Sequence, residues 1–342
     1  MRFALIGCGN IGQLRAQAIS RSPGNALAVA VDLDRDRATS LAAAHGAEAS
    51  ADWKSVLGRT DVDAVIVSTA PSLHAEMTVA ALEAGKHVLC EKPLARSVEE
   101  CREMVQAADR TGRFLATGFN YRFYPSAAKA RELLDSGIIG ELDHIRSYTG
   151  YSATAHDHAW LHDAKVMGGG ALRDNGIHLI DLTTWFLGDV ADIKGFGSNA
   201  VWGFEGCEDN GFALLRSKSG RIASLQASWT EWRGYQLKVE IYGTLGCIRM
   251  WCFPMITQVV WADKIGGRTR KKTHLFPKTQ LTEKLHSYRR IVVDSFVEEI
   301  DAFVKAANGG KSNVATGRDG LLTIEVADGA TRMEPAGAAV PA

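Results

Sequence analysis

Short apolar runs alternate with amphipathic stretches over the first 117 residues of the chain. The apolar runs have the length of buried strands, and the stretches between them repeat apolar residues at helical spacing. This pattern predicts strands at residues 3–6, 27–31, 64–68, 87–90 and 114–117, and helices that end near residue 21 and span about 73–84 and 98–111. Repeated strand–helix–strand units predict a parallel, doubly wound sheet, which binds ligands beyond the carboxyl ends of its strands.

After Gly118 this alternation stops and strand patterns dominate. A helix over residues 125–136 is predicted to end at Gly137, because glycine is common just beyond the end of a helix. Residues 236–242 alternate apolar and polar side chains, which is typical of a strand with one buried face. Further strands are predicted from residue 142 onward and at residues 222–229 and 256–261. We therefore expect a second domain built on a large, mainly antiparallel open sheet.

Two amphipathic patterns, at residues 291–307 and 316–331, predict C-terminal helices that partly pack back on the first domain. The chain is thus expected to divide into domains at residues 1–120 and 121–333, followed by a flexible tail at 334–342. The second domain is also rich in tryptophan, with Trp202, Trp229, Trp232, Trp251 and Trp261. This aromatic surface favours an oligomer interface, and a monomeric aromatic core is the alternative.

One stretch inside the second domain, residues 168–187, has a different pattern. On a helix, Asp174, His178 and Asp181 fall on one narrow stripe together with Trp185, while apolar residues cover the other directions. A helix that is apolar nearly all round is buried, so its polar stripe must face a partner, a cavity or a ligand. The alternative is a core helix whose polar side chains are hydrogen-bonded within the protein.

The composition is that of an ordinary soluble globular protein, with 342 residues of which 46% are hydrophobic and 23% charged. Lysine plus arginine equals aspartate plus glutamate at 39 each, so the chain has no net basic field for nucleic acid or an anionic membrane. The basic run at residues 268–272 is local and typical of a solvated loop. We expect small molecules or further copies of this chain as partners, and neither nucleic acid nor a membrane.

Six cysteines are scattered without a C-x-x-C pair, which favours a reducing compartment. The first apolar run is too short for a signal peptide, and no apolar run approaches the ~20 residues that span a bilayer. These features together predict a cytoplasmic protein.

The first predicted strand runs into Gly7, Gly9 and Gly12, which form a G-x-G-x-x-G motif that opens the next helix. The first glycine permits a tight turn, the second lets a pyrophosphate approach the backbone, and the third lets helix and strand pack closely. Asp32 follows the second strand, 20 residues after Gly12, where a carboxylate can accept hydrogen bonds from the adenosine ribose. Strand, glycines, helix and acid together predict that the first domain binds a dinucleotide.

Asp32 favours NAD over NADP, because a carboxylate would repel the 2′-phosphate of NADP. Arg35 and Arg37 follow closely and could turn toward such a phosphate, which keeps NADP as a second choice; surface positions on the next helix are the alternative. Further candidates lie where the predicted parallel strands end. The full set of predicted cofactor-binding residues is Gly7, Gly9, Asn10, Ile11, Gly12, Asp32, Arg37, Ser68, Thr69, Pro71, His74, Glu91 and Lys92.

Three residues could carry chemistry. Lys92 follows a predicted strand, where its ammonium could donate to a substrate oxygen or pair with a carboxylate in a tight turn. His178 could act as general base toward an alcohol, with Asp174 one turn earlier to orient it, or it could be a satisfied core histidine. The histidines between residues 156 and 162 show no zinc-binding spacing, so no metal site is predicted.

Three motifs in order resemble the Gfo/Idh/MocA oxidoreductase family, which is named for glucose–fructose oxidoreductase and inositol dehydrogenase. They are the glycine turn at residues 3–12, the run A-A-L-E-A-G-K-H-V-L-C-E-K-P-L-A at residues 80–95, and the stretch from residue 168 through Asp174 and His178 to Asp181. The resemblance covers residue 3 to about residue 331. It implies a Rossmann domain joined to a large open sheet through which such chains form homodimers or homotetramers.

The resemblance also implies that Lys92, Asp174 and His178 form the catalytic group, with Lys92–Pro93 as a cis peptide that holds the lysine near the nicotinamide. Family members mostly oxidise or reduce a secondary alcohol with NAD(P). We therefore predict an NAD-dependent dehydrogenase of a sugar, sugar derivative or cyclitol. The alternatives are an NADP-dependent reductase of the aldehyde or dihydrodiol type, and a non-catalytic NAD(P)-binding regulator with the same fold.

For the substrate we expect a pocket wall formed by residues 148–165 with Tyr121 and Arg122. Within it, His156 and Trp160 offer the hydrogen-bonding and stacking groups that a sugar would use. Arg122 could bind a carboxylate or phosphate of the substrate, or anchor the turn at Glu91. Asp181 is expected to be a structural acceptor that supports its helix.

Overall fold

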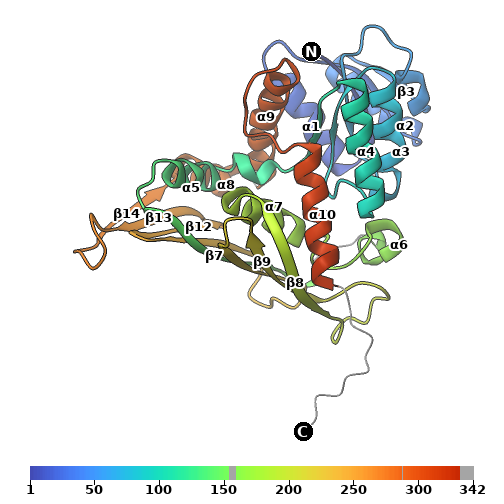
Figure 1. Cartoon of the computed structure of the whole chain (residues 1–342). Helices are drawn as coiled ribbons and strands as arrows, with labels where there is room; N and C mark the ends of the chain where they lie inside the picture. The colour runs from blue at the N-terminus through green and yellow to red at the C-terminus, as the bar shows by residue number, and fades with distance from the viewer. Residues whose placement is uncertain (154–158, 287, 332–342) are drawn as a thin grey trace. The chain divides into compact units, whose positions relative to one another are not determined.

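The computed structural model describes residues 1–153, 159–286 and 288–331 of the chain. Within them the chain forms two compact units, and each is described here by itself (Figure 1). The first unit consists of Met1–Tyr124 and Pro277–Leu322, and the second of Pro125–Phe276 and the chain from Thr323 onward. Among the described residues, no helix is long and apolar enough to cross a membrane.

The first unit is built on a six-stranded sheet in the order β3-β2-β1-β4-β5-β6, in which every neighbouring pair is parallel. The predicted doubly wound sheet is therefore confirmed. Strand β3 is missing from the prediction, because it has only three residues and two of them are exposed, so that no apolar run marks it. The strands are β1 (Arg2–Ile6), β2 (Ala26–Val31), β3 (Glu48–Ser50), β4 (Ala64–Val67), β5 (His87–Cys90) and β6 (Leu115–Thr117).

Helix α9 (Tyr288–Ala307) belongs to the core of the first unit although it lies far along the chain. Its Phe303 meets Phe3 of β1 with ring centroids 6.1 Å apart, and Figure 1 shows α9 beside α1. The other helices of this unit are α1 (Asn10–Arg21), α2 (Arg35–His45), α3 (His74–Glu83), α4 (Val98–Thr111) and α8 (Pro277–His286), with short 3₁₀ turns η1 (Trp53–Val56), η2 (Pro71–Leu73) and η3 (Asn120–Phe123).

The second unit is built on an eight-stranded sheet in the order β14-β13-β12-β11-β7-β10-β9-β8. Every neighbouring pair is antiparallel except β7 with β10, which confirms the predicted mainly antiparallel sheet. The strands are β7 (Leu142–Gly150), β8 (Val190–Ser198), β9 (Asn210–Ser217), β10 (Ile222–Ser228), β11 (Gln236–Gly243), β12 (Gly246–Cys252), β13 (Met255–Trp261) and β14 (Arg270–Leu275). Short segments η5 (Ala159–His162) and α6 (Ala164–Met167) precede α7 (Gly176–Leu187), and α10 (Gly317–Thr331) begins in the first unit and ends in the second.

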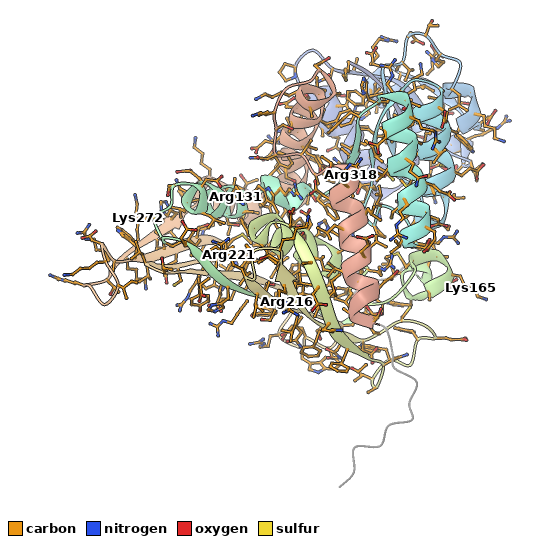
Figure 2. All side chains as sticks on the ribbon, viewed as in Figure 1. Arg131, Lys165, Arg216, Arg221, Lys272 and Arg318 are labelled. Atoms are coloured by element: carbon orange, nitrogen blue, oxygen red, sulfur yellow. The ribbon has the colours of Figure 1, made fainter. Side chains whose placement is uncertain are left out.

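Helices pack on one face of this sheet. Helix α5 (Pro125–Asp135) packs on β12 and β13, and α7 packs on β7 and β10 (Figure 1). The opposite face keeps apolar side chains in solvent: Phe212 and Leu214 of β9 are exposed in a row with Arg216, which Figure 2 labels. The tryptophans of this unit are divided, since Trp229 is fully buried whereas Trp232 is 68% exposed.

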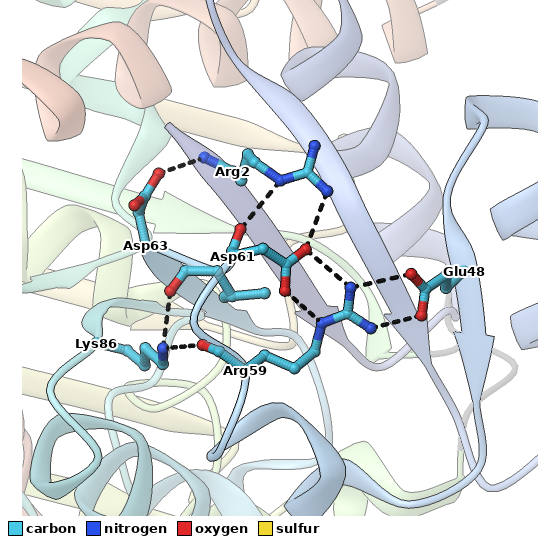
Figure 3. A network of polar contacts seen from close by, with 7 residues as sticks. Arg2, Glu48, Arg59, Asp61, Asp63 and Lys86 are labelled. Atoms are coloured by element: carbon cyan, nitrogen blue, oxygen red, sulfur yellow. Dashed lines mark hydrogen bonds and ion pairs between the residues drawn. The ribbon is translucent and has the colours of Figure 1, made fainter.

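A network of charged residues closes the amino-terminal end of the parallel sheet (Figure 3). Arg2 and Arg59 both donate to Asp61, with Nη2–Oδ2 distances of 3.0 and 2.9 Å. Lys86 is nearly buried and donates to the carbonyl oxygens of Val62, at 2.8 Å, and Arg59. Ligands of such sheets bind at the opposite end of the strands, so this network is structural.

Replacing Lys86 with methionine should lower the free energy of unfolding by about 1–3 kcal/mol, because two carbonyl oxygens lose their donor while staying shielded from water. Thermal unfolding followed by circular dichroism measures the effect. The exposed Lys311 serves as the control, since Lys311→Met should leave the midpoint where it is. Equal midpoints for Lys86→Met and the unmodified protein would contradict the structural role of this ammonium.

Candidate active site

The three glycines of the first motif have different surroundings. Gly7 has a φ of +99°, and a Cβ on it would lie 2.3 Å from the carbonyl oxygen of Ser68. A Cβ on Gly12 would lie 2.0 Å from the carbonyl oxygen of Gly7. A Cβ on Gly9, by contrast, would meet nothing within 4 Å. Gly7 and Gly12 are thus required by the protein's own packing, whereas Gly9 borders open space at the start of α1, where a pyrophosphate would fit.

Asp32 lies at the carboxyl end of β2, beside this turn. Its Oδ2 accepts a hydrogen bond from the backbone N–H of Cys8 at 2.7 Å, and its Oδ1 accepts one from that of Asp34 at 2.9 Å. Burial, followed by the charge of Asp32, raises the pKa of the Cys8 thiol to about 12, so this thiol stays protonated. Arg37 is exposed on α2, with its Nε 3.1 Å from Asp34 Oδ2.

The loop after β4 supplies Ser68, Thr69 and Pro71, and His74 begins α3. The His74 ring is fully buried, with Nδ1 2.9 Å from the carbonyl oxygen of Pro93 and Nε2 3.0 Å from that of Thr69. Burial lowers the pKa of His74, and a neutral ring donates through one nitrogen only. The neutral ring therefore donates to one of these two carbonyl oxygens, and it is packed between the loop after β4 and the turn that carries Lys92 rather than lining an open surface.

Glu91, Lys92 and Pro93 follow β5 directly. The peptide bond Lys92–Pro93 is cis, as the resemblance implies. Glu91 is buried: its Oε1 accepts from Arg15 Nε at 2.6 Å, and its Oε2 accepts from the backbone N–H of Lys92 at 3.3 Å. The Lys92 side chain is partly exposed, so it is accessible to a ligand.

Tyr121 and Arg122 lie in η3, also in the first unit. Tyr121 is nearly buried and stacks on Tyr124, with ring centroids 4.5 Å apart. Arg122 is buried, and its Nη2 lies 3.6 Å from Asp319 Oδ1 of α10. The roles of Tyr121 and Arg122 toward a substrate remain predictions.

In the second unit the sequence-based placement of Asp174 is wrong. Helix α7 begins only at Gly176, so Asp174 lies in the turn before it and does not share a helical stripe with His178. The cause is the glycine-rich stretch, whose backbone bonds to another segment: the N–H of Ala171 donates to the carbonyl oxygen of Glu208 at 2.9 Å. A Cβ on Gly170 would lie 2.2 Å from that same oxygen, so only glycine permits this approach.

Asp174 is nevertheless buried close to His178 in sequence and held by two donors that the sequence pattern did not single out. The hydroxyl of Tyr151 and Nε1 of Trp229, at 3.1 Å, both donate to Asp174 Oδ2. Burial and then the charge of Asp174 raise the pKa of Tyr151, which keeps the phenol protonated as a donor. Trp229 stood out in the sequence only as apolar surface, and Tyr151 only as one position within the expected pocket wall at residues 148–165.

Glu208 binds the backbone of the turn that precedes Asp174. Its carboxylate oxygens each lie 2.8 Å from a backbone N–H, one of Gly170 and one of Leu172. Burial raises the pKa of Glu208, while these N–H groups counteract that shift. The turn is also tied to α10, because Arg173 pairs with Asp328. The position of Asp174 therefore depends on residues far from it in sequence.

An aromatic group surrounds Trp229. The His162 ring meets it edge-on with centroids 5.4 Å apart, and Phe204, stacked on His162 at 4.1 Å, meets it at 6.2 Å. Trp160 is 41% exposed, whereas the predicted substrate residue His156 lies outside the described residues. Asp181 is fully buried in α7, in keeping with a structural role that remains a prediction.

The structure thus assembles two parts of the predicted site. In the first unit the glycine turn, Asp32 and the Lys92 turn lie at strand ends of one sheet; in the second, Asp174 and His178 lie at the start of α7. Within the described residues, no group of three or more histidine, cysteine, aspartate or glutamate side chains could hold a metal ion. That Lys92, Asp174 and His178 act as one group stays a prediction.

Known proteins resemble this chain over both units. The model of an oxidoreductase family with an NAD-binding Rossmann fold matches residues 1–119, and that of the GFO/IDH/MocA C-terminal domain matches residues 127–249. Inositol 2-dehydrogenase of Rhizobium meliloti (strain 1021) is 29% identical over 338 residues, 97% of this chain and 96% of that protein. The 1,5-anhydro-D-fructose reductase of Ensifer adhaerens is 32% identical over 249 residues, 72% of this chain and 74% of that protein.

Solved structures share the fold as well. Levoglucosan dehydrogenase in complex with NADH has a TM-score of 0.84 and 25% sequence identity, and the match covers 96% of this chain and 95% of that one. The complex of the same enzyme with NADH and levoglucosan also has a TM-score of 0.84, at 26% identity, with 96% of this chain and 95% of that chain covered. The family models match well over half of the chain, so this protein belongs to the GFO/IDH/MocA family of oxidoreductases, and its first domain is an NAD-binding Rossmann fold.

Proposed function

We propose that this protein is an NAD-dependent dehydrogenase that oxidises a secondary alcohol of a sugar, sugar derivative or cyclitol. The observation that carries the proposal is the buried carboxylate of Asp174, held by Tyr151 and Trp229 just before the helix of His178, in a chain that resembles an inositol 2-dehydrogenase over 97% of its length. The similarity to levoglucosan dehydrogenase in its levoglucosan complex also favours a sugar-like substrate. Beside Asp174, the rings of Trp229 and His162 offer faces and edges of the kind that pack against sugar C–H groups.

The residues of the first unit fit NAD. Open space at Gly9 and the N–H groups at the start of α1 suit a pyrophosphate, and Asp32 at the end of β2 suits the ribose hydroxyls. The carboxylate of Asp32 disfavours a 2′-phosphate. Arg37 pairs with the carboxylate of Asp34, so the negative charge of Asp32 is not offset by this arginine. NAD held by these residues would supply the acceptor for the hydride of the substrate carbon.

The remaining chemistry falls to side chains of this protein. A ring nitrogen of His178 takes the proton of the substrate hydroxyl, and in the reverse direction it returns that proton. The ammonium of Lys92 donates a hydrogen bond to the same oxygen and stabilises negative charge there. Asp174, fixed by Tyr151 and Trp229, orients His178 or accepts from a neighbouring hydroxyl of the substrate.

Lys92→Met and His178→Asn should each lower kcat by about 10²–10⁴-fold, the usual contribution of a positioned acid–base or charge-stabilising group. Initial rates of NADH formation with a panel of inositols, aldoses and anhydrosugars measure this. His45→Asn, on α2, is the matched control and should retain full turnover. Near-normal turnover of either site variant would overturn the assignment of that residue.

Gly9→Ala should weaken NADH binding at least tenfold and leave the unfolding midpoint unchanged, because its Cβ would enter space that the protein leaves open. Gly7→Ala should instead lower the unfolding temperature, because its Cβ would clash with the carbonyl oxygen of Ser68. Fluorescence titration with NADH and calorimetric unfolding separate the two effects. Unaltered NADH affinity in Gly9→Ala would argue against a cofactor at this turn.

A reductase is the second candidate function. It is favoured by the similarity to a 1,5-anhydro-D-fructose reductase at 32% identity over 72% of this chain. Asp32 argues against the NADPH that such a reaction often uses. Oxidation of NADPH with aldehydes and keto sugars, run beside the NAD panel, decides between the two reactions.

We further propose that the chain assembles as a homodimer or homotetramer through the uncovered face of the second unit's sheet. Phe196, which is 80% exposed, and Leu214 lie on neighbouring strands of that face, and exposed apolar side chains of this size favour an interface. Leu214→Glu should therefore lower the mass measured by light scattering, whereas Lys218→Glu at an exposed position should not. A monomeric mass for the unmodified protein would rule this assembly out.

A further inference from the structure

Arg15 is a charged side chain inside the core of the first unit. It lies on the buried face of α1 with Gly12 and Ile19 and has no exposed surface. Its Nε donates to Glu91 at 2.6 Å, its Nη1 pairs with Glu299 of α9, and its Cζ lies 3.7 Å from the centre of the Phe296 ring. One guanidinium therefore joins two carboxylates that come from distant parts of the chain.

Stability alone does not account for this arrangement. Removing charges from water is costly, and buried ion pairs can often be replaced by apolar side chains without loss of stability. The planar guanidinium presents several N–H donors in fixed directions, so it can bind two carboxylates at once, which an ammonium does less well. An arginine is therefore expected at this position if its task is to hold two carboxylates in fixed directions.

Glu91 connects Arg15 to the turn of Lys92. The oxygen of Glu91 that does not face Arg15 Nε accepts from the backbone N–H of Lys92. The space around the pair is closed, because a Cβ on Gly118 would lie 2.8 Å from Arg15 Nη2 and 3.0 Å from Glu91 Oε2. On the other side of the turn, His74 Nδ1 lies 2.9 Å from the carbonyl oxygen of Pro93. The turn is thus contacted on both sides of Lys92, by Glu91 and by the buried ring of His74.

Helix α1 is also the helix that the glycine turn opens. It begins at Asn10, directly after Gly9, and Arg15 lies in its second turn. A rigid helix therefore joins the backbone that faces the cofactor to the side chain that holds Glu91. Two hydrogen bonds, from Arg15 to Glu91 and from the Lys92 N–H to Glu91, thus connect α1 to the turn of Lys92 within the first unit.

We propose that Arg15 is a positioning residue that holds Glu91 and thereby keeps Lys92 in register with the cofactor-binding end of α1. The proposal rests on the function proposed above for Lys92. The proposal assigns different roles to the two carboxylates that contact Arg15. The contact with Glu91 positions the Lys92 turn, whereas the contact with Glu299 stabilises the packing of α1 on α9.

Arg15→Lys should lower kcat at least tenfold, while the dissociation constant of NADH and the KM for the alcohol change less than threefold. Glu299→Gln is the matched control: it keeps the Arg15–Glu91 pair and should retain kcat within twofold. Arg15→Met with Glu299→Leu replaces the fully buried Arg15–Glu299 ion pair by apolar side chains and still removes the donor to Glu91. It should show the same loss of kcat as Arg15→Lys if the single variant does not fold. Unchanged kcat in a folded Arg15 variant, or an equal loss in Glu299→Gln, would overturn the proposal.

A second readout does not depend on turnover. In the NADH complex, the rate at which Lys92 reacts with an amine-acylating reagent can be followed by peptide mass spectrometry. That rate should change at least threefold in Arg15→Lys and stay constant in Glu299→Gln, and equal rates in all three proteins would refute positioning. If the unmodified protein oxidises no alcohol, the proposed function fails, and the acylation rates still decide the role of Arg15.

Discussion

The first unit depends on the pairing of a guanidinium that water cannot reach. Arg15 satisfies its charge only when Glu91 after β5 and Glu299 on α9 are both in place. The apolar cluster that contains Phe3 and Phe303 draws the same elements together without regard to direction. The ion pairs add direction, so the arrangement of α1, β5 and α9 that buries the core also orients the turn of Lys92.

In the second unit a buried carboxylate is held by neutral hydrogen-bond donors instead of a guanidinium. Asp174 is buried, and the hydroxyl of Tyr151 and the indole N–H of Trp229 approach the same carboxylate oxygen. Glu208 accepts hydrogen bonds from two backbone N–H groups of the turn before Asp174. Neutral donors hold a carboxylate in place without cancelling its charge, so Asp174 is fixed without an ion pair to either donor.

The glycine turn of the candidate site could be predicted because its signals are local. The three glycines follow a short apolar strand at fixed spacing, and the positive φ of Gly7 and the approach of Gly12 to Gly7 act over a few residues. The error at Asp174 has a different origin, because helical spacing extends back to Asp174 in the sequence, whereas contacts between the glycine-rich turn and the distant Glu208 replace the helix there. Arg15 carries a local signal as well, because a charged residue on the apolar face of α1 requires a buried partner.

The sequence by itself determined the two kinds of sheet and the glycine turn, and it supplied the candidates for the chemistry. These follow from periods of two and 3.6 residues and from the conformations open to glycine, all of which are properties of short segments. Only the tertiary structure decided how the buried charges are paired. Arg15 is separated from Glu91 by 76 residues and from Glu299 by 284, and no short-range pattern relates residues so far apart. Their meeting is a consequence of packing, because a buried charge selects its partner from whatever the fold brings within hydrogen-bond distance.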